Sequence, residues 1–320
     1  ENQTPVGVVH FLGGAFAGAS PQLSYAALLE GFAKAGYLVI TTPFDLTFNH
    51  LQCAKSVAMS LDRCLTALNT TPAPSQPSDD SISSSEVASN GYRSLPVYAV
   101  GHSNGSLLHL LIGSLEGIDG TRVPDVKASV LMSYNNKPVS EAVPGGLSPQ
   151  VAPVLSQVKT LGDILKTQLS SSGLPTIDDI PKPTDSLSQA ALPFIEQLDT
   201  TLSELAEGAV DFTPTPTESR ALIQQHYRVP QTLLIEFEDD NTDESPEMLD
   251  VLNKNQVSGV VEYQKLPGVG HVTPLGADLT WEVKGAFSPL DAIGQAIKSD
   301  GLRRVDELTN NILMWMKRRV

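Results

Sequence analysis

The sequence predicts an α/β protein with a mainly parallel sheet of about six strands, flanked by helices and carrying an inserted helical cap. Three observations predict this class. Short apolar runs of strand length alternate with segments of helical periodicity. The chain of 320 residues is long enough to bury a large core. Its hydrophobic content of 41% is ordinary for a globular protein.

Six apolar runs have the length and composition of buried strands. In order they are Val6 to Leu12, Tyr37 to Thr41, Val97 to Val100, Ala128 to Ser133, Thr232 to Phe237 and Val260 to Leu266. Helical patterns separate most of them, which favours parallel pairing. A last helix is expected over residues 302–317. Its apolar residues recur at steps of three and four: Leu302, Val305, Leu308, Ile312 and Trp315.

Two stretches interrupt this alternation. Residues 69–94 are rich in Ser, Pro and Asp and poor in large apolar groups, which predicts a mobile surface loop. Residues 136–229 contain two apolar stripes at helical spacing, within 151–165 and 187–205, and are expected to form the helical cap. The core would then comprise residues 1–135 and 230–320.

The most informative motif is Gly101-His102-Ser103-Asn104-Gly105, which lies between an apolar strand and an apolar helix. A G-x-S-x-G turn of this kind holds its serine in a strained, exposed conformation and needs small residues on both sides. Chance alone gives roughly 0.2 matches in a chain of this composition, so the context matters more than the pattern. The context makes Ser103 the candidate nucleophile.

Two further residue types follow in the order that a serine triad requires. An acidic loop comes directly after the strand that ends at Phe237, and a Gly-rich loop ending in His271 comes after the strand that ends at Leu266. His271 is therefore the candidate base. The order of serine, acid and histidine is that of α/β-hydrolases and differs from two other triad folds.

The chain resembles the α/β-hydrolase superfamily over its full length and, more closely, the DUF1350 family of cyanobacteria and plastid-bearing eukaryotes. The segments that carry this resemblance are Val9 to Phe16, Gly36-Tyr37 with Thr42-Pro43-Phe44, the Ser103 turn, Asp243-Glu244, and Gly270 to Leu275. The resemblance implies the fold, a hydrolase-type site and a lid at the position of the cap. It also implies a plastid or the cyanobacterial cytoplasm as the location.

Asp240 is the preferred triad acid, because the register that aligns Phe237 to Asp240 with the Gly-x-x-Asp of the superfamily places it at the catalytic position. Asp239 and Asp243 remain alternatives. In the expected mechanism Ser103 attacks an ester carbonyl, His271 takes its proton, and the acid orients the imidazole.

The oxyanion that forms in this reaction needs backbone N–H donors. We expect one from Asn104, which follows the nucleophile, and one from Gly14 or Ala15, in the loop after the first strand. Phe16, Phe44 and His102 are candidates for the substrate pocket. The first loop lacks the glycine spacing of nucleotide-binding motifs, which argues against a nucleotide.

The remaining histidines are expected to be structural, although His50 is also a candidate to line the pocket with Phe44, Asp45 and Phe48. No histidine pair has metal-ligand spacing, so neither a metal nor another cofactor is expected. The net charge of −15 argues against nucleic-acid partners and against tight binding to anionic lipid. The expected partner is a small lipophilic ester, with transient contact to a lipid surface through the cap as an additional option. The oligomeric state is left open.

Cys53 and Cys64 both fall in one expected helix, too far apart for a disulfide, and are predicted to be free thiols. The chain begins at Glu1, and its start has neither a transit-peptide composition nor a signal-sequence pattern, which predicts a processed or shortened chain. No apolar run approaches the 18 residues of a membrane span.

Three functions are compatible with these patterns. The first is a serine hydrolase of lipophilic carboxylic esters, such as an acyl lipid or the phytyl ester of a chlorophyll-type pigment. The second is an acyltransferase or transesterase that passes the same acyl-enzyme to an alcohol. The third is a binding or assembly protein that keeps the fold without chemistry. The presence of all three triad residue types argues against the third.

Overall fold

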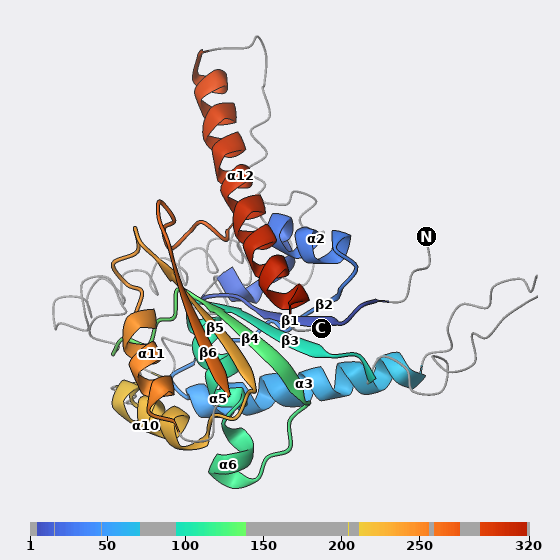
Figure 1. The fold of residues 1–320 in the computed structure, drawn as a ribbon, viewed down its shortest axis with the longest axis vertical. Helices are drawn as coiled ribbons and strands as arrows, with labels where there is room; N and C mark the ends of the chain where they lie inside the picture. Colours follow the sequence, from blue (N-terminus) through green and yellow to red (C-terminus); the bar gives the residue numbers. More distant parts are fainter. Residues whose placement is uncertain are drawn as a thin grey trace, which may run out of the picture.

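A computed structural model describes residues 5–15, 17–45, 47–70, 94–138, 204, 211–255, 259–275 and 289–318. Its six strands form one parallel sheet with the order β2-β1-β3-β4-β5-β6 (Figure 1). The strands are β1 (Val8–Leu12), β2 (Leu38–Thr41), β3 (Val97–His102), β4 (Val126–Met132), β5 (Gln231–Phe237) and β6 (Val260–Leu266). All six predicted strands are confirmed, and no boundary is displaced by more than two residues.

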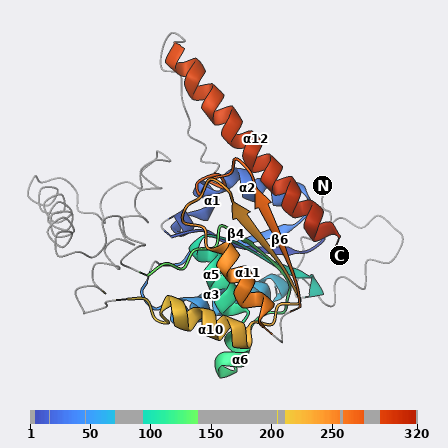
Figure 2. The ribbon, with the colours of Figure 1, turned by 60° about the vertical axis from the view of Figure 1, so that its left-hand side comes forward.

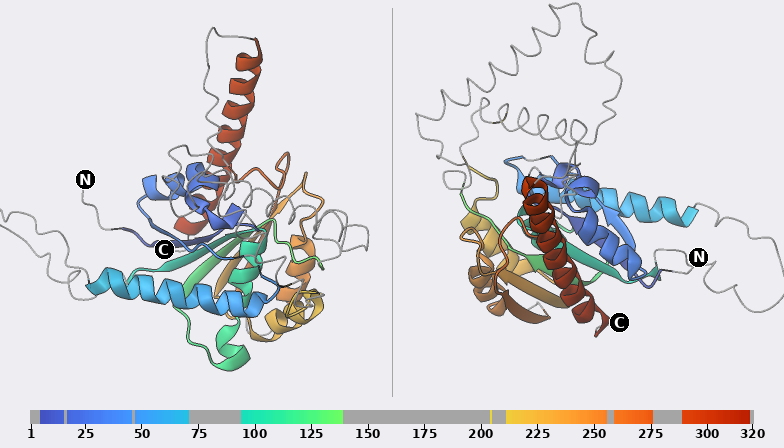
Figure 3. Two further views of the ribbon diagram at one scale, coloured as in Figure 1. Left: turned by 180° about the vertical axis from the view of Figure 1, so that it is seen from behind. Right: turned by 90° about the horizontal axis from the view of Figure 1, so that it is seen from above.

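Helices cover both faces of this sheet (Figures 1 and 3). One face carries α2 (Ala26–Lys34) and α12 (Pro289–Lys317), and the other carries α3 (His50–Thr70), α5 (Asn104–Ile112), α10 (Pro216–His226) and α11 (Ser245–Asn253). The short elements η1 (Ala17–Ala19), α1 (Pro21–Ser24) and α6 (Leu115–Asp119) complete the described part of the chain. Burial on both faces explains why the central strands are apolar almost throughout rather than alternating.

The core on the α2 and α12 side consists of large side chains from both helices and from every second residue of the central strands. Phe32 of α2 and Trp315 of α12 are completely buried there. The two helices approach closely, because a Cβ added to Gly31 would lie 2.6 Å from Cγ2 of Thr309. Glycine at this position therefore permits the helix packing that covers this half of the sheet.

The core on the opposite side joins α3, α5, α10 and α11. Helix α10 begins with a capping box, in which Thr215 accepts from the backbone N–H of Glu218 and Glu218 accepts from the backbone N–H of Thr215. It packs against α5, α6 and α11. Although α10 lies within the interval 136–229, it belongs to the helical layer of the core. The predicted cap over residues 136–229 therefore included a helix that belongs to the core, and residues 139–210 of that interval lie outside the described residues apart from Glu204. The predicted loop over residues 69–94 likewise falls mostly outside them.

The last helix is longer than predicted. It begins at Pro289 rather than Leu302, and its N-terminal part projects beyond the sheet (Figures 1 and 2). The apolar stripe that predicts residues 302–317 corresponds to the part that packs on the core, where Val305, Ile312 and Trp315 are buried. Leu290, Ile293 and Ile297 also recur at steps of three and four, so the periodicity in fact extends toward the N-terminus of the helix.

Cys53 and Cys64 both lie in α3 as free cysteines, which confirms the prediction for these two residues. Among the helices of the described ranges, none is long and apolar enough to cross a bilayer. The carboxyl ends of the parallel strands lie along one edge of the sheet, so the loops after β1, β3, β5 and β6 meet there.

The packing of α12 predicts a sharp contrast between two neighbouring residues. Trp315 is fully buried and Met314 is 61% exposed. Trp315→Ala is expected to lower the free energy of unfolding by about 3–5 kcal/mol, because it leaves a large cavity. Met314→Ala, the matched control, should change it by less than about 1 kcal/mol. Urea unfolding followed by circular dichroism measures both, and equal losses in the two variants would contradict this account of the core.

Candidate active site

Ser103 occupies the sharp turn between β3 and α5, as the G-x-S-x-G pattern predicts. Its backbone has φ 56°, a value that L-residues rarely adopt. A Cβ at Gly105 would lie 2.2 Å from the carbonyl oxygen of Leu12, and one at Gly101 would lie 2.8 Å from the carbonyl oxygen of Gly105. Both glycines are therefore required by close backbone approach, and together they present Ser103 at the carboxyl edge of the sheet.

The loop after β1 lies directly beside this serine. A Cβ built on Gly14 would lie 3.5 Å from Oγ of Ser103. The N–H of Gly14, however, donates to the hydroxyl of Tyr25 at 2.8 Å. The N–H groups of Ala15 and Asn104 have no hydrogen-bond partner in the described parts of the chain. Of the two alternatives for the donor from this loop, the N–H of Ala15 is thus unengaged and that of Gly14 is occupied.

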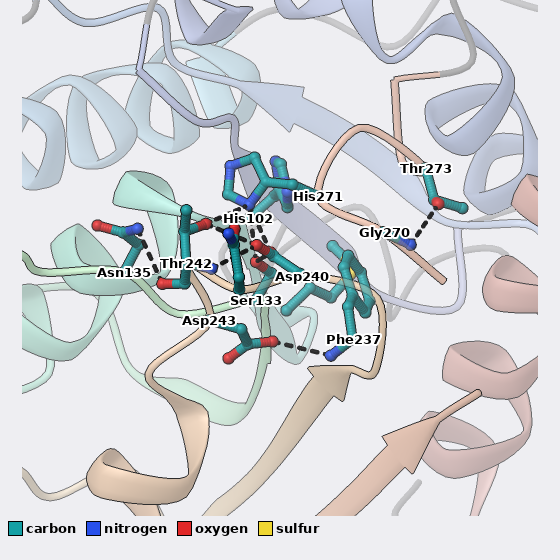
Figure 4. A network of polar contacts seen from close by, with 12 residues as sticks. His102, Ser133, Asn135, Phe237, Asp240, Thr242, Asp243, Gly270, His271 and Thr273 are labelled. Atoms are coloured by element: carbon teal, nitrogen blue, oxygen red, sulfur yellow. Dashed lines mark hydrogen bonds and ion pairs between the residues drawn. The ribbon is translucent and has the colours of Figure 1, made fainter. Parts of the chain in front are cut away.

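Asp240 and His271 form a direct pair across the loops after β5 and β6 (Figure 4). Oδ2 of Asp240 lies 2.6 Å from Nδ1 of His271. The Asp240 side chain is almost fully buried, whereas 35% of the His271 side chain is exposed. Because β5 and β6 are neighbours in the sheet, the loops after them bring Asp240 and His271 into contact. The imidazole lies at the surface of the site.

Four hydrogen bonds surround the Asp240 carboxylate. Oδ2 accepts from His271 and from the hydroxyl of Ser133, and Oδ1 accepts from the N–H and hydroxyl of Thr242 at 2.9 Å and 2.6 Å. Burial alone would raise the pKa of Asp240, but the hydrogen bonds from His271, Ser133 and Thr242 outweigh it and hold the pKa well below its usual range. An ionised Asp240 can only accept, so Nδ1 of His271 carries the proton and Nε2 is left as the basic nitrogen.

Ser133 and Thr242 are site residues that the sequence patterns did not identify. Ser133 follows β4 with φ 44°, a backbone conformation that only the structure reveals. Thr242 lies two residues after Asp240, which is the spacing of an Asx-turn. Asp243 makes the same kind of turn with Ser245, so the spacing alone does not single out Asp240.

The two alternative acids have different surroundings. Asp239 is exposed, and its backbone N–H donates to the carbonyl of Val269. Asp243 accepts from the backbone N–H groups of Phe237 and Ser245, each at 2.8 Å, and so ties the acidic loop to the end of β5 (Figure 4). Burial raises the pKa of Asp243 to about 6 despite these bonds. Among the three aspartates, Asp240 is the one hydrogen-bonded to His271.

Ser103 and His271 are not hydrogen-bonded to each other in the described structure. His102 connects their surroundings, since it precedes Ser103 in the turn and its ring centroid lies 4.9 Å from that of His271. In serine enzymes without substrate the hydrogen bond between nucleophile and base is often long and shortens on binding. The structure thus brings Asp240 and His271 into contact and places Ser103 next to Gly14 and His102.

Candidate pocket residues border the turn on the α3 side. His50, the first residue of α3, stacks on Phe212 with centroids 4.4 Å apart, and its Nε2 lies 3.5 Å from Nδ2 of Asn104. Burial lowers the pKa of His50 to about 4, so it is neutral. Phe48 lies 5.4 Å from Phe212. These residues form an aromatic wall beside Asn104, and Phe212 is the member that the sequence patterns did not indicate.

The other pocket candidates lie elsewhere or outside the described residues. Phe44 is 8% exposed and would contact a Cβ added to Gly18, so it packs under the first loop. Phe16 lies outside the described residues.

His10 and His109 form a buried edge-to-face pair 5.2 Å apart, and His10 also contacts Thr42. Burial lowers the pKa of both histidines, which therefore remain neutral. In the ranges that the structure describes, no three His, Cys, Asp or Glu side chains are arranged to hold a metal ion.

The parallel sheet, the serine turn after β3, the carboxylate after β5 and the histidine after β6 define an α/β-hydrolase fold. The chain belongs to a family described as "Protein of unknown function (DUF1350)", whose model matches residues 2–167 and 182–318. This confirms both levels of the resemblance seen in the sequence.

Several solved structures are similar to this chain in three-dimensional structure. They include a sugar hydrolase, YeeB, from Lactococcus lactis (TM-score 0.49, 13% identity, 100% of this chain and 93% of that chain). A peroxisomal α/β-hydrolase, Lpx1, from Saccharomyces cerevisiae has a TM-score of 0.46 at 12% identity, covering 98% of this chain and 79% of that one. A monoacylglycerol lipase from Paleococcus ferrophilus has 0.40 at 16% identity, with 94% and 96% covered. No curated protein matches the chain in sequence.

The burial of Asp243 predicts a pH effect on stability. Its pKa is about 6 in the folded protein against 3.8 for an ordinary aspartate. Between these values the unfolded chain loses its proton while the folded protein keeps it, so this group lowers the free energy of unfolding as pH rises from about 4 to about 6. Asp243→Asn should remove that decline. The exposed Asp239→Asn is the matched control and should keep it.

Urea unfolding at about pH 4.5, 5.5 and 6.5 measures the effect, because the difference between wild type and Asp243→Asn should shrink or reverse with rising pH. A constant offset between the two proteins across this range would show that Asp243 does not titrate as expected.

Proposed function

We propose that this protein is a serine hydrolase that cleaves carboxylic esters through an acyl-enzyme. The single observation that carries the proposal is the pair formed by the buried, ionised Asp240 and Nδ1 of His271 at 2.6 Å, beside a serine held at positive φ. A pure binding role would require neither the oriented imidazole nor the strained serine. The ester specificity and the roles of the individual residues are part of this proposal.

The reaction begins when Nε2 of His271 accepts the proton of Ser103 and Oγ attacks the ester carbonyl carbon. The carbonyl oxygen becomes an oxyanion, which accepts hydrogen bonds from the N–H groups of Asn104 and Ala15. The imidazolium then donates its proton to the leaving alcohol, and the acyl-enzyme remains. Water attacks the acyl group with His271 again as base, which releases the acid and restores Ser103.

Asp240 holds the imidazole in the tautomer that leaves Nε2 free, and its negative charge stabilises the imidazolium. Ser133 and Thr242 fill the remaining acceptor positions of the carboxylate, so that its geometry is fixed before substrate binds. These two hydroxyl groups support the acid and take no part in proton transfer to the substrate.

A lipophilic ester is the proposed substrate class. Two features support it: the aromatic wall of Phe48, His50 and Phe212 beside Asn104, and the apolar stripes at helical spacing within residues 151–165 and 187–205. An acyl lipid and the phytyl ester of a chlorophyll-type pigment are the two substrates to compare. A plastid or cyanobacterial cell, the location implied by the family resemblance, contains both.

Labelling with a fluorophosphonate tests the activated serine. The wild-type protein is expected to gain one adduct on Ser103, with loss of fluoride, because Oγ attacks the phosphorus once His271 removes its proton. Ser103→Ala should gain none, and His271→Ala should react at least about 100-fold more slowly. Intact-mass spectrometry over a time course measures all three. A folded wild-type protein that forms no adduct would contradict the proposed function.

The choice of triad acid predicts a difference between adjacent residues. Asp240→Asn is expected to lower kcat by about 10³–10⁴-fold, because an amide cannot hold the required tautomer. The exposed Asp239→Asn is the matched control and should stay within about threefold of wild type. Hydrolysis of p-nitrophenyl esters of increasing chain length measures kcat for each.

Full activity in Asp240→Asn would overturn the assignment of the acid. Product analysis with an added alcohol in the same assay separates hydrolysis from acyl transfer, since only a transferase makes new ester efficiently in water.

A further inference from the structure

A buried chain of hydrogen bonds runs from the loop after β1 to the serine turn and plays no part in the reaction described above. The N–H of Gly14 donates to the hydroxyl of Tyr25 at 2.8 Å, and that hydroxyl lies 2.8 Å from Nδ1 of His102. Tyr25, between α1 and α2, is completely buried, and His102 is 1% exposed. Three segments that are distant in sequence are therefore joined by two bonds that water does not reach.

The two ends of this network suggest a direction for both bonds. A backbone N–H can only donate, so the Tyr25 oxygen accepts from Gly14. Nδ1 of His102 is the acceptor within reach of the buried Tyr25 proton among the described residues, so we assign the hydroxyl as donor and Nδ1 as unprotonated. Burial, together with the neighbouring His271, lowers the pKa of His102 to about 3, and burial raises the pKa of Tyr25 well above its usual range. Both groups therefore stay neutral near neutral pH.

The hydrogen-bonded residues Gly14, Tyr25 and His102 contact both sides of the candidate site. On one side, a Cβ built on Gly14 would lie 3.1 Å from Cβ of Ser103 and 3.4 Å from Nδ1 of His102. On the other side, the His102 ring lies 4.9 Å from the His271 ring and 6.2 Å from that of Phe237. A shift of His102 would therefore disturb both the first loop and the base.

Tyr25 also limits the loop sterically. A Cβ at Gly13 would lie 2.6 Å from Cε2 of Tyr25. The aromatic ring and its hydroxyl thus hold the backbone of Gly13 and Gly14 by packing and by hydrogen bonding. The next N–H along the chain, that of Ala15, is the one without a partner in the described structure.

We propose that Tyr25 and His102 are positioning residues for the oxyanion hole. They engage the N–H of Gly14 and fix the loop against the serine turn, so that Ala15 and Asn104 are the two donors to the oxyanion. This inference rests on the proposed hydrolase function and deepens it. It assigns a role to the histidine at the variable position of the G-x-S-x-G turn, and it withdraws Gly14 as an oxyanion donor.

Tyr25→Phe removes the hydroxyl and keeps the ring. Because the oxyanion forms only in the transition state, we expect kcat to fall by about 10- to 100-fold while KM changes by less than about threefold. The rate of fluorophosphonate labelling should fall by a similar factor. The matched control is Tyr227→Phe. Its hydroxyl is equally buried and contacts Thr232 at 2.9 Å, away from the site. It should lose similar stability, and its labelling rate and kcat should remain those of wild type.

A second pair of variants tests the acceptor at His102. His102→Asn places an amide oxygen near the position of Nδ1, whereas His102→Leu has similar size and no acceptor. Both lose the ring, so a structural role alone would affect them equally. We expect His102→Asn to be labelled at least about fivefold faster than His102→Leu, and the double variant Tyr25→Phe with His102→Asn to be no faster than Tyr25→Phe alone.

The outcomes separate the two proposals. If the wild type is labelled and Tyr25→Phe reacts as fast as Tyr227→Phe, the positioning role is overturned and the hydrolase function stands. Equal rates for His102→Asn and His102→Leu overturn it as well, even if Tyr25→Phe fails to fold. If the folded wild type is never labelled, the proposed function fails, and this inference fails with it.

Discussion

The arrangement of the site depends on one steric constraint, the contact between the start of α5 and the end of β1. The carbonyl oxygens of Leu12 and Gly13 lie so close to Gly105 that no side chain fits between them. This contact forces the turn into which Ser103 is locked, and it brings the loop after β1 alongside the serine. The hydroxyl of Tyr25 then fixes the position of this loop by accepting a hydrogen bond from the N–H of Gly14.

Two aspartates three residues apart show how local hydrogen bonding determines charge. Asp240 accepts from two hydroxyls, a backbone N–H and an imidazole, and is ionised despite its burial. Asp243 is also largely buried, and its hydrogen bonds from Phe237 and Ser245 do not offset that burial, so it retains its proton to about pH 6. The first is prepared to stabilise an imidazolium. Asp243 organises the loop, and at neutral pH its buried negative charge lowers the free energy of unfolding.

Much of the fold could be predicted from the sequence, because buried parallel strands are short apolar runs and the serine turn has its own signature. The positions of Ser103 and His271 at the ends of β3 and β6 follow from the same patterns. The roles of Tyr25 and Ser133 could not be predicted, because they depend on contacts between segments far apart in the chain. The choice between Gly14 and Ala15 as oxyanion donor could not be made from the sequence for the same reason, since the N–H of Gly14 is directed to a tyrosine whose position no local pattern reveals. The start of α12 could have been predicted, because Leu290, Ile293 and Ile297 already recur at helical steps.

The pairing of β4 with β5 has a consequence for how this family can vary. Met132 pairs with Ile235, so the chain must close a loop of roughly a hundred residues before these strands can meet. The entropy of loop closure rises only with the logarithm of length, and doubling or halving that interval would change stability by about 0.6 kcal/mol. A change of length between β4 and β5 therefore costs the fold little in loop-closure entropy, and the sheet that carries the Asp240–His271 pair tolerates it on that account.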